Sequence, residues 1–189
     1  MQHSVCVYCG SRPGHDEAFT RDAETLGRGL AEAGLRLVYG AGDVGLMGSV
    51  ARAAQQAGGD TFGVIPAHLV AWEVGKTDLT RYIVTETMHE RKKVMFMNSD
   101  SVAVLPGGAG SLDELFEVLT WRQLGLHEKP IFLVNTNGYW DPFMSLMNHV
   151  VDHGFADRTL LDYVTVVADA DAALSALRRA FSLRNVVTE

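Results

Sequence analysis

Short apolar segments alternate with amphipathic ones along almost the whole chain. Most positions of the apolar segments are hydrophobic, rather than every second one, which is typical of parallel strands covered on both faces. We expect strands at residues 4–8, 35–39, 61–65, 82–85, 101–105, 130–134 and 164–168. Helical periodicity between them predicts helices at residues 16–33, 45–57, 87–98, 111–124, 140–153 and 169–181.

This order of elements predicts an α/β fold. We expect a doubly wound, Rossmann-like, mostly parallel sheet with helices on both of its faces. No repeat, low-complexity tract or linker divides the chain, so a single domain is predicted over residues 1–183, with a frayed tail at 184–189. Residues 66–81 form the one long connection.

Glycine-rich segments follow three of the predicted strands. They are Gly10-Ser11, Gly40 to Gly45 and Gly107 to Gly110. In a doubly wound sheet, ligands bind at the carboxyl ends of the strands, near the point where the strand order reverses. The three segments therefore predict one binding edge.

The segment from Pro106 to Glu114 reads Pro-Gly-Gly-Ala-Gly-Ser-Leu-Asp-Glu. Its glycines Gly107, Gly108 and Gly110 allow backbone N–H groups to approach an anion closely, and the helix that follows adds its N-terminal amides and dipole. Ser111 could contact a phosphate through its hydroxyl. Ser111 and Glu114 also fit a helix capping box, and the spacing leaves both roles open.

Glu114 has a second interpretation. A carboxylate repels a neighbouring phosphate, so Glu114 makes chemical sense when it points past the phosphate toward a sugar carbon. There it could direct or deprotonate a water molecule and stabilise a developing oxocarbenium ion, as carboxylates do in glycoside hydrolysis.

A charged run, Met88-His-Glu-Arg-Lys-Lys93, opens another predicted helix. Arg91 can fork onto phosphate oxygens or hydrogen-bond a sugar hydroxyl, and Lys92 supplies a point charge. Taken alone, however, such a run more often forms a solvated face in which Glu90 balances its neighbours.

The segment Gly40-x-Gly42-x-x-Gly45 lies between a strand and a helix, which is the context of a dinucleotide fingerprint. It follows the second strand rather than the first, and Asp60, the acidic residue that should end the next strand, precedes it. We therefore favour a packing or phosphate-side turn over an NAD site.

Charge, composition and cysteine content exclude several classes of partner and cofactor. The 189 residues carry a net charge of −7, so no nucleic acid polymer or anionic membrane is expected as a partner. The N-terminus has no signal sequence and no apolar run is long enough for a membrane helix, which predicts a cytoplasmic protein.

Cys6 and Cys9 are expected to be reduced, buried thiols on opposite faces of the first strand. No metal-ligand spacing is evident, and we expect no metal and no cofactor.

Together, the segments 106–114 and 88–92 resemble the signature of the Lonely Guy family of cytokinin riboside 5′-monophosphate phosphoribohydrolases, proteins often labelled lysine decarboxylases. The resemblance covers nearly the whole chain. It also includes Cys9-Gly-Ser11, Val38-Tyr-Gly40, Gly45-Leu-Met-Gly48, Ile65-Pro66, Glu73-Val-Gly75, Leu119-Thr-Trp121, Gly125-Leu-His127 and Gly138-Tyr-Trp-Asp-Pro142.

The resemblance implies a homodimer that cleaves an AMP-type nucleoside 5′-monophosphate, including one with an N6-prenylated adenine, to free base and ribose 5-phosphate. Arg91 and Glu114 would form the catalytic pair. The substrate contacts that the motifs imply are Gly10, Ser11, Glu73, Met88, Lys92, Gly107, Gly108, Gly110, Ser111 and Thr120.

Three departures from the family pattern are visible. Ser111 replaces the usual threonine and keeps its hydroxyl, and Asp113-Glu114 replaces the usual pair of glutamates. After the second strand, Gly40-Ala-Gly42 and Asp43 replace the usual consecutive glycines. This change could alter the part of the pocket that receives the base or its prenyl group, and with it the substrate preference.

Two rival functions remain at this level. A pyridoxal-phosphate decarboxylase needs a Schiff-base lysine in a defined pocket, and no lysine is marked for that role. A non-catalytic nucleotide carrier or sensor on the same fold would keep the glycine loop but would need neither Arg91 nor Glu114.

Overall fold

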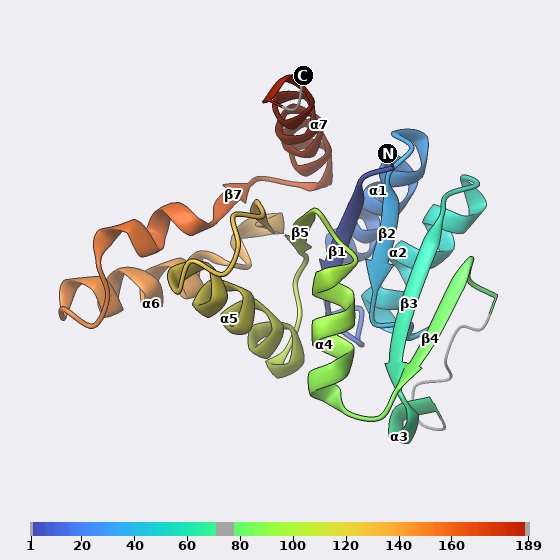
Figure 1. The fold of residues 1–189 in the computed structure, drawn as a ribbon, viewed down its shortest axis with the longest axis horizontal. Helices are drawn as coiled ribbons and strands as arrows, with labels where there is room; N and C mark the ends of the chain where they lie inside the picture. Colours follow the sequence, from blue (N-terminus) through green and yellow to red (C-terminus); the bar gives the residue numbers. More distant parts are fainter. Residues whose placement is uncertain (1, 71–77, 188–189) are drawn as a thin grey trace.

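The computed structural model describes residues 2–70 and 78–187. Seven strands form one parallel sheet in the order β4-β3-β2-β1-β5-β6-β7 (Figure 1). The strands are β1 (Ser4–Tyr8), β2 (Arg36–Tyr39), β3 (Thr61–Pro66), β4 (Arg81–Thr85), β5 (Ser101–Val104), β6 (Ile131–Val134) and β7 (Thr165–Val167). The predicted parallel sheet is confirmed, and each predicted strand lies within two residues of an observed one.

The helices are α1 (Glu17–Glu32), α2 (Gly45–Gln56), α3 (Ala67–Val70), α4 (Met88–Met97), α5 (Ala109–Gln123), α6 (Asp141–Asp152) and α7 (Ala170–Val187). Six of these match predicted helices. The short helix α3 and the 3₁₀ helices η1 (Thr136–Gly138) and η2 (Arg158–Tyr163) were not predicted, because so few residues carry no periodic pattern.

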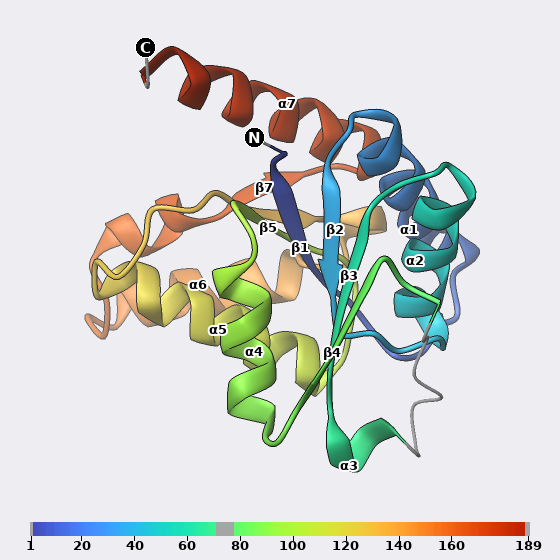
Figure 2. The ribbon, with the colours of Figure 1, turned by 45° about the vertical axis from the view of Figure 1, so that its right-hand side comes forward.

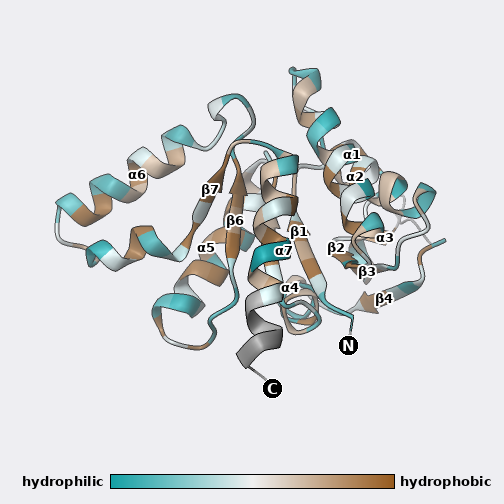
Figure 3. Ribbon diagram, turned by 90° about the horizontal axis from the view of Figure 1, so that it is seen from above, coloured by the Kyte–Doolittle hydropathy of each residue, from teal (hydrophilic) through white to brown (hydrophobic). Residues whose placement is uncertain are grey.

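Helices cover both faces of the sheet, as expected. The side chains of α1, α2 and α7 pack on one face and those of α4, α5 and α6 on the other (Figure 2). Cys9 belongs to the first of these cores and Cys6 to the second, and both are buried free thiols, which confirms the prediction for them. Most of the central strands are hydrophobic along their length (Figure 3).

The strand order places a switch point between β1 and β5. From β1 the chain winds outward through β2 and β3 to β4, and then returns to place β5 on the other side of β1. Cys6 is therefore paired with both Val38 of β2 and Val102 of β5. A ligand site is expected at the carboxyl end of this junction.

Local signals set the helix boundaries near that junction. Asp16 caps α1 by accepting a hydrogen bond of 2.8 Å from the N–H group of Ala18. Thr87 and Glu90 form a complete capping box at the start of α4. Glu90 is thus committed to holding the end of the helix rather than to balancing the neighbouring cations.

At the C-terminus, α7 extends farther than predicted. Its backbone is helical through Val187, six residues beyond the predicted end at residue 181. Among the helices of the described ranges, none combines the length and the apolar composition needed to cross a membrane.

Candidate active site

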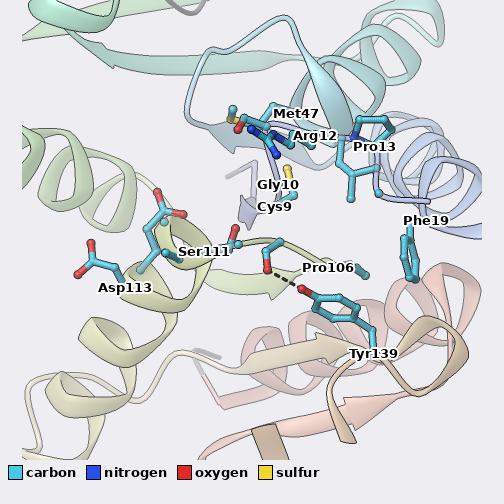
Figure 4. A pocket seen from close by; sticks show the side chains of 18 of the residues that line it. Cys9, Gly10, Arg12, Pro13, Phe19, Met47, Pro106, Ser111, Asp113 and Tyr139 are labelled. Atoms are coloured by element: carbon cyan, nitrogen blue, oxygen red, sulfur yellow. Dashed lines mark hydrogen bonds between the residues drawn. The ribbon is translucent and has the colours of Figure 1, made fainter. Parts of the chain in front are cut away.

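A pocket of about 450 Å³ opens at the carboxyl edge of the sheet, over the junction of β1 and β5 (Figure 4). Loops that follow β1 and β5, together with the first turns of α2, α4 and α5, surround it. Nine of the residues predicted to form the site line this pocket: Gly10, Ser11, Met88, Arg91, Gly107, Gly108, Gly110, Ser111 and Glu114. The convergence expected from the glycine-rich segments is therefore confirmed for two of the three.

Helix α5 begins inside the predicted anion loop, earlier than expected. Its N-cap is Gly108, which offers no side-chain cap, and Ser111 lies in the first turn. The capping-box interpretation of Ser111 is thus wrong. Because the first backbone N–H groups of α5 have no helical partners and border the pocket, they are suited to bind an anion.

Close packing holds the loop before α5. The N–H group of Gly10 donates a hydrogen bond of 3.0 Å to the carbonyl of Pro106. A Cβ atom on Gly107 would overlap the Ser111 hydroxyl and lie 2.9 Å from the backbone nitrogen of Gly10. By contrast, a Cβ on Gly108 or Gly110 would meet no atom within 4 Å. Gly107 is therefore required by packing, whereas Gly108 and Gly110 leave the pocket open to a ligand.

Arg91 is buried, so the solvated-face interpretation is wrong for it. Its guanidinium Nη2 donates to the carbonyl of Gly40 at 2.8 Å and its Nε donates to the carbonyl of Val64 at 3.1 Å. A third contact joins Nη1 to the Met88 sulfur at 3.8 Å. The guanidinium also occupies the place that a side chain at Gly40 would take. These contacts hold the charge at the wall of the pocket.

Lys92 is also buried, but it is not among the described residues that line the pocket. Its Nζ lies 2.9 Å from Asp113 Oδ2 and 3.2 Å from Glu117 Oε1. Burial alone would lower the pKa of Lys92, but the hydrogen bonds to Asp113 and Glu117 outweigh it and raise that pKa. Lys92 therefore stays protonated and ties α4 to α5 rather than lining the site.

Of the two remaining predicted contacts, one is absent from the described lining of the pocket and the other is not described. Thr120 is exposed, and its hydroxyl donates to the carbonyl of Phe116 at 2.7 Å within α5. Glu73 lies outside the described residues.

Glu114 lies on α5, one turn beyond Gly110, and lines the same pocket as Arg91. Burial raises the pKa of the Cys9 thiol, the negative charge of Glu114 raises it further, and the positive charge of Arg91 opposes both. Both charges thus act on Cys9, the residue that follows β1. This arrangement places a carboxylate and a guanidinium around one cavity.

Sequence reasoning missed several residues that line the pocket, among them Cys9, Arg12, Phe19, Met47 and Tyr139. Tyr139 follows β6, the neighbour of β5, and its hydroxyl donates to the carbonyl of Gly107 at 2.7 Å (Figure 4). The ring of Phe19 meets that of Tyr139 edge to face, with 5.5 Å between centroids. Position after a strand was the available signal, because Arg12 follows β1 at the switch point and Tyr139 follows β6, the next strand beyond β5.

The segment after β2 does not form a dinucleotide loop. Gly40 makes room for the Arg91 guanidinium, and a Cβ on Gly45 would overlap the backbone of Ser11 and Arg12. Ala41 is buried and Asp43 is paired with Arg52, and neither is among the described residues that line the pocket. The preferred packing interpretation is thus confirmed.

The described ranges do not contain the groups that a Schiff-base enzyme or a metal site would need in this pocket. No lysine lines the pocket there, and no group of three or more histidine, cysteine or carboxylate side chains could hold a metal ion. The exposed His149 and His153 at the end of α6 lie with 4.0 Å between their ring centroids and 43° between their ring planes.

Solved structures share this fold. The molybdenum cofactor carrier protein of Chlamydomonas rheinhardtii superposes with a TM-score of 0.73 at 22% identity, covering 96% of this chain and 99% of that one. A molybdenum cofactor binding protein from Rippkaea orientalis gives a TM-score of 0.72 at 20% identity, with 96% and 98% covered. At this identity the likeness concerns the fold alone.

Curated relatives are more similar. A cytokinin riboside 5′-monophosphate phosphoribohydrolase of Rhodococcoides fascians is 43% identical over 93% of this chain and 89% of its own. The enzyme of the same name from Mycobacterium tuberculosis is 43% identical over 92% of each chain. The rice enzyme LOG is 44% identical over 80% of this chain and 62% of its own.

A family model described as "Possible lysine decarboxylase" matches residues 47–177. That range contains α4 with Arg91 and α5 with Glu114, but not the loop after β1. Together with the relatives at more than 40% identity, this match shows that the chain belongs to the Lonely Guy family, the family of phosphoribohydrolases once described as lysine decarboxylases.

Proposed function

We propose that this protein hydrolyses the N-glycosidic bond of AMP-type nucleoside 5′-monophosphates, including those with an N6-prenylated adenine, and releases the free base and ribose 5-phosphate. One observation carries the proposal. A single pocket joins the open N-terminus of α5, which is suited to a phosphate, to the charged pair Arg91 and Glu114. The relatives named cytokinin riboside 5′-monophosphate phosphoribohydrolases support this choice of substrate.

The phosphate binds first, on the loop before α5. Gly108 and Gly110 leave that surface open, so the backbone N–H groups of the first turn can reach the phosphate oxygens. The Ser111 hydroxyl adds a donor at the same turn, and Gly10 and Ser11 close the other side. Binding at this end fixes where the ribose lies.

The reaction then takes place about one helical turn farther along. Glu114 accepts a proton from a water molecule, whose oxygen forms a bond to C1′. The electrons of the C1′–N bond leave with the base, which takes up a proton from the medium. The negative charge of Glu114 also stabilises the oxocarbenium character of the transition state, and Arg91 orients the ribose or the carboxylate from the opposite wall.

The test is base release from a panel of AMP, N6-isopentenyl-AMP and other purine and pyrimidine monophosphates. Glu114→Gln should reduce turnover by a factor of about 10² or more while nucleotide binding is largely retained. Glu24→Gln, the same change on the exposed side of α1, should be silent. Wild-type base release by the Glu114→Gln variant would remove the assigned role, and no base release by the wild type would refute the proposed activity.

Two alternatives predict different results. A nucleotide carrier would bind AMP at the same loop without releasing adenine, and Glu114→Gln would change nothing. A pyridoxal-phosphate decarboxylase would show the absorbance of a lysine Schiff base after incubation with the cofactor. Its reactive lysine must be neutral to attack, whereas the pKa of the buried Lys92 is raised by Asp113 and Glu117.

We also propose that the chain forms a homodimer in the cytoplasm and requires no metal or cofactor. Apolar side chains are exposed where α4 and α5 end, and they include Met97 and Leu124 at 68% and 67% exposure. Such a surface favours association with a second copy. Sedimentation velocity tests this, and Leu124→Glu should shift the protein toward the monomer. A wild-type protein that sediments as a monomer at micromolar concentration would exclude the dimer.

A further inference from the structure

The phosphate end of the pocket needs positive charge. Among the lining residues that the structure describes, the carboxylates of Asp113 and Glu114 are balanced by two cations, Arg91 and Arg12. A phosphate monoester brings nearly two further negative charges at neutral pH. Backbone N–H groups offset part of this charge, so the position of each guanidinium decides which one can meet the phosphate.

The Arg91 guanidinium is held too far from the anion loop to bind the phosphate there. Its guanidinium binds carbonyls at the ends of β2 and β3. In the sheet, β1 lies between β2 and β5, and the anion loop follows β5. Neighbouring strands are about 4.8 Å apart, which puts the end of β5 roughly 10 Å from that of β2. Lys92 is committed to Asp113 and Glu117 and does not line the pocket.

Arg12 lies in the loop after β1, one strand closer to the anion loop than Gly40, the Arg91 partner that follows β2. It follows β1, which pairs directly with β5, and it is two residues beyond Gly10, whose N–H group binds Pro106. The close approach of Gly45 to the backbone of residues 11 and 12 fixes the chain there, because any side chain at Gly45 would overlap it. Residues 10–12 are thus held between the segment after β2 and the loop after β5.

The side chain of Arg12 is available to a ligand. Arg12 is exposed at the rim of the pocket, and within the described residues its guanidinium makes no hydrogen bond or ion pair. A guanidinium presents several N–H donors in a fork that matches two phosphate oxygens.

We infer that Arg12 is a specificity residue that binds the 5′-phosphate of the substrate and gives the enzyme its preference for a nucleotide over the corresponding nucleoside. The inference rests on the proposed function for the identity of the nucleotide. It assigns the phosphate two recognition elements, the N-terminus of α5 and the exposed guanidinium of Arg12. The motif segments alone contain only the first.

Binding of ribose 5-phosphate, measured by calorimetry, tests the inference without requiring turnover. Arg12→Ala should raise its dissociation constant roughly tenfold, since a charge-assisted contact at an exposed site is lost. Arg12→Lys keeps the charge without the fork and should lose less. Arg28→Ala is the matched control, because it removes the same charge from the exposed side of α1 and should bind like the wild type.

The kinetic arm uses AMP and adenosine with the same variants. We expect Arg12→Ala to lower kcat/KM for AMP roughly tenfold through KM and to lower kcat/KM for adenosine, which has no phosphate, by a much smaller factor. Equal ribose 5-phosphate affinity in Arg12→Ala and Arg28→Ala would overturn the role of Arg12. A wild-type protein that binds ribose 5-phosphate but releases no adenine would instead refute the proposed function, and the binding arm would still decide about Arg12.

Discussion

The hydroxyl of Tyr139 donates a 2.7 Å hydrogen bond to the backbone carbonyl of Gly107. This bond connects the segment after β6 to the loop that precedes α5. It orients the peptide group at the start of that loop, and the edge-to-face contact with Phe19 supports the Tyr139 ring from the side of α1. Tyr139 thus acts on the anion loop from outside the glycine motif.

Tyr139→Phe removes this hydrogen bond and keeps the ring. We expect KM for AMP to rise several-fold, because the loop loses one of its supports, while the free energy of unfolding falls by no more than about 1 kcal/mol. Steady-state base release and urea denaturation measure the two effects. Tyr163→Phe is the matched control, since that ring lies against Arg122 rather than at the pocket. Equal KM values for both variants would contradict the prediction.

The adjacent glycines Gly107 and Gly108 offer a paired test of the loop. In Gly107→Ala the new methyl group would overlap the Ser111 hydroxyl and crowd the backbone of Gly10. We expect a loss of about 1–3 kcal/mol in stability and a loss of at least tenfold in kcat/KM, because loop and helix must move apart.

Gly108→Ala is expected to behave differently. Its methyl group meets no atom within 4 Å, so the stability should change by less than about 1 kcal/mol. The methyl group would enter the space reserved for the phosphate, and KM for the nucleotide should therefore rise. Chemical denaturation and base release separate the variants, and a Gly108→Ala protein with unchanged KM would argue against phosphate binding on this loop.

Much of this fold could be predicted from the sequence. Apolar runs such as 101–105 mark buried parallel strands directly. Glu90, by contrast, was interpreted as balancing its charged neighbours, and only the structure shows that it forms a capping box with Thr87. The order of the strands in the sheet is a tertiary property. It brings the segments after β1, β5 and β6 together, which explains why Arg12 and Tyr139 could not be found from local spacing.

The charged run at the start of α4 also shows that local sequence does not reveal tertiary neighbours. Nothing in Arg91-Lys92 distinguishes a buried cation from a solvated one, because the partners that decide it are distant in sequence. Arg91 is buried by carbonyls of β2 and β3, and Lys92 by carboxylates of α5. Family resemblance pointed to their importance, but only the packing of α4 separates the pocket residue Arg91 from the structural residue Lys92.

Lys92→Met tests that separation. Lys92 is buried between two carboxylates, of which Glu117 is mostly buried and Asp113 is 61% exposed. Because Asp113 is exposed, solvent screens part of the electrostatic cost of removing the lysine charge. Removing the charge leaves both carboxylates uncompensated and should destabilise the fold by about 1–2 kcal/mol. Lys93→Met, at the adjacent exposed position, should change stability by less than about 0.5 kcal/mol. Urea denaturation of both variants measures the difference, and equal midpoints would contradict the structural role.

A last prediction concerns pH and the ring of His127. Its Nε2 donates to the carbonyl of Val118 at 2.8 Å, because a carbonyl can only accept, and its Nδ1 accepts from the N–H group of Lys129 at 3.1 Å. Protonation at Nδ1 would break the second bond. Burial lowers the pKa of His127 below its usual 6.5, the charges of Arg122 and Lys129 lower it further, and the bond to Val118 opposes them.

The pKa of His127 is lower in the folded protein than in the unfolded chain, so the folded state favours the neutral ring. The contribution of this ring to stability is therefore present above pH 6.5 and is lost as the pH falls through the lowered pKa. His127→Asn, whose side-chain oxygen can still accept from Lys129 but does not titrate, should therefore lose less stability than the wild type between pH 7 and 5. Urea midpoints across that range measure the slope. His15→Asn, at an exposed position, should follow the wild-type slope, and an unchanged slope in His127→Asn would show that this ring does not set the acid sensitivity.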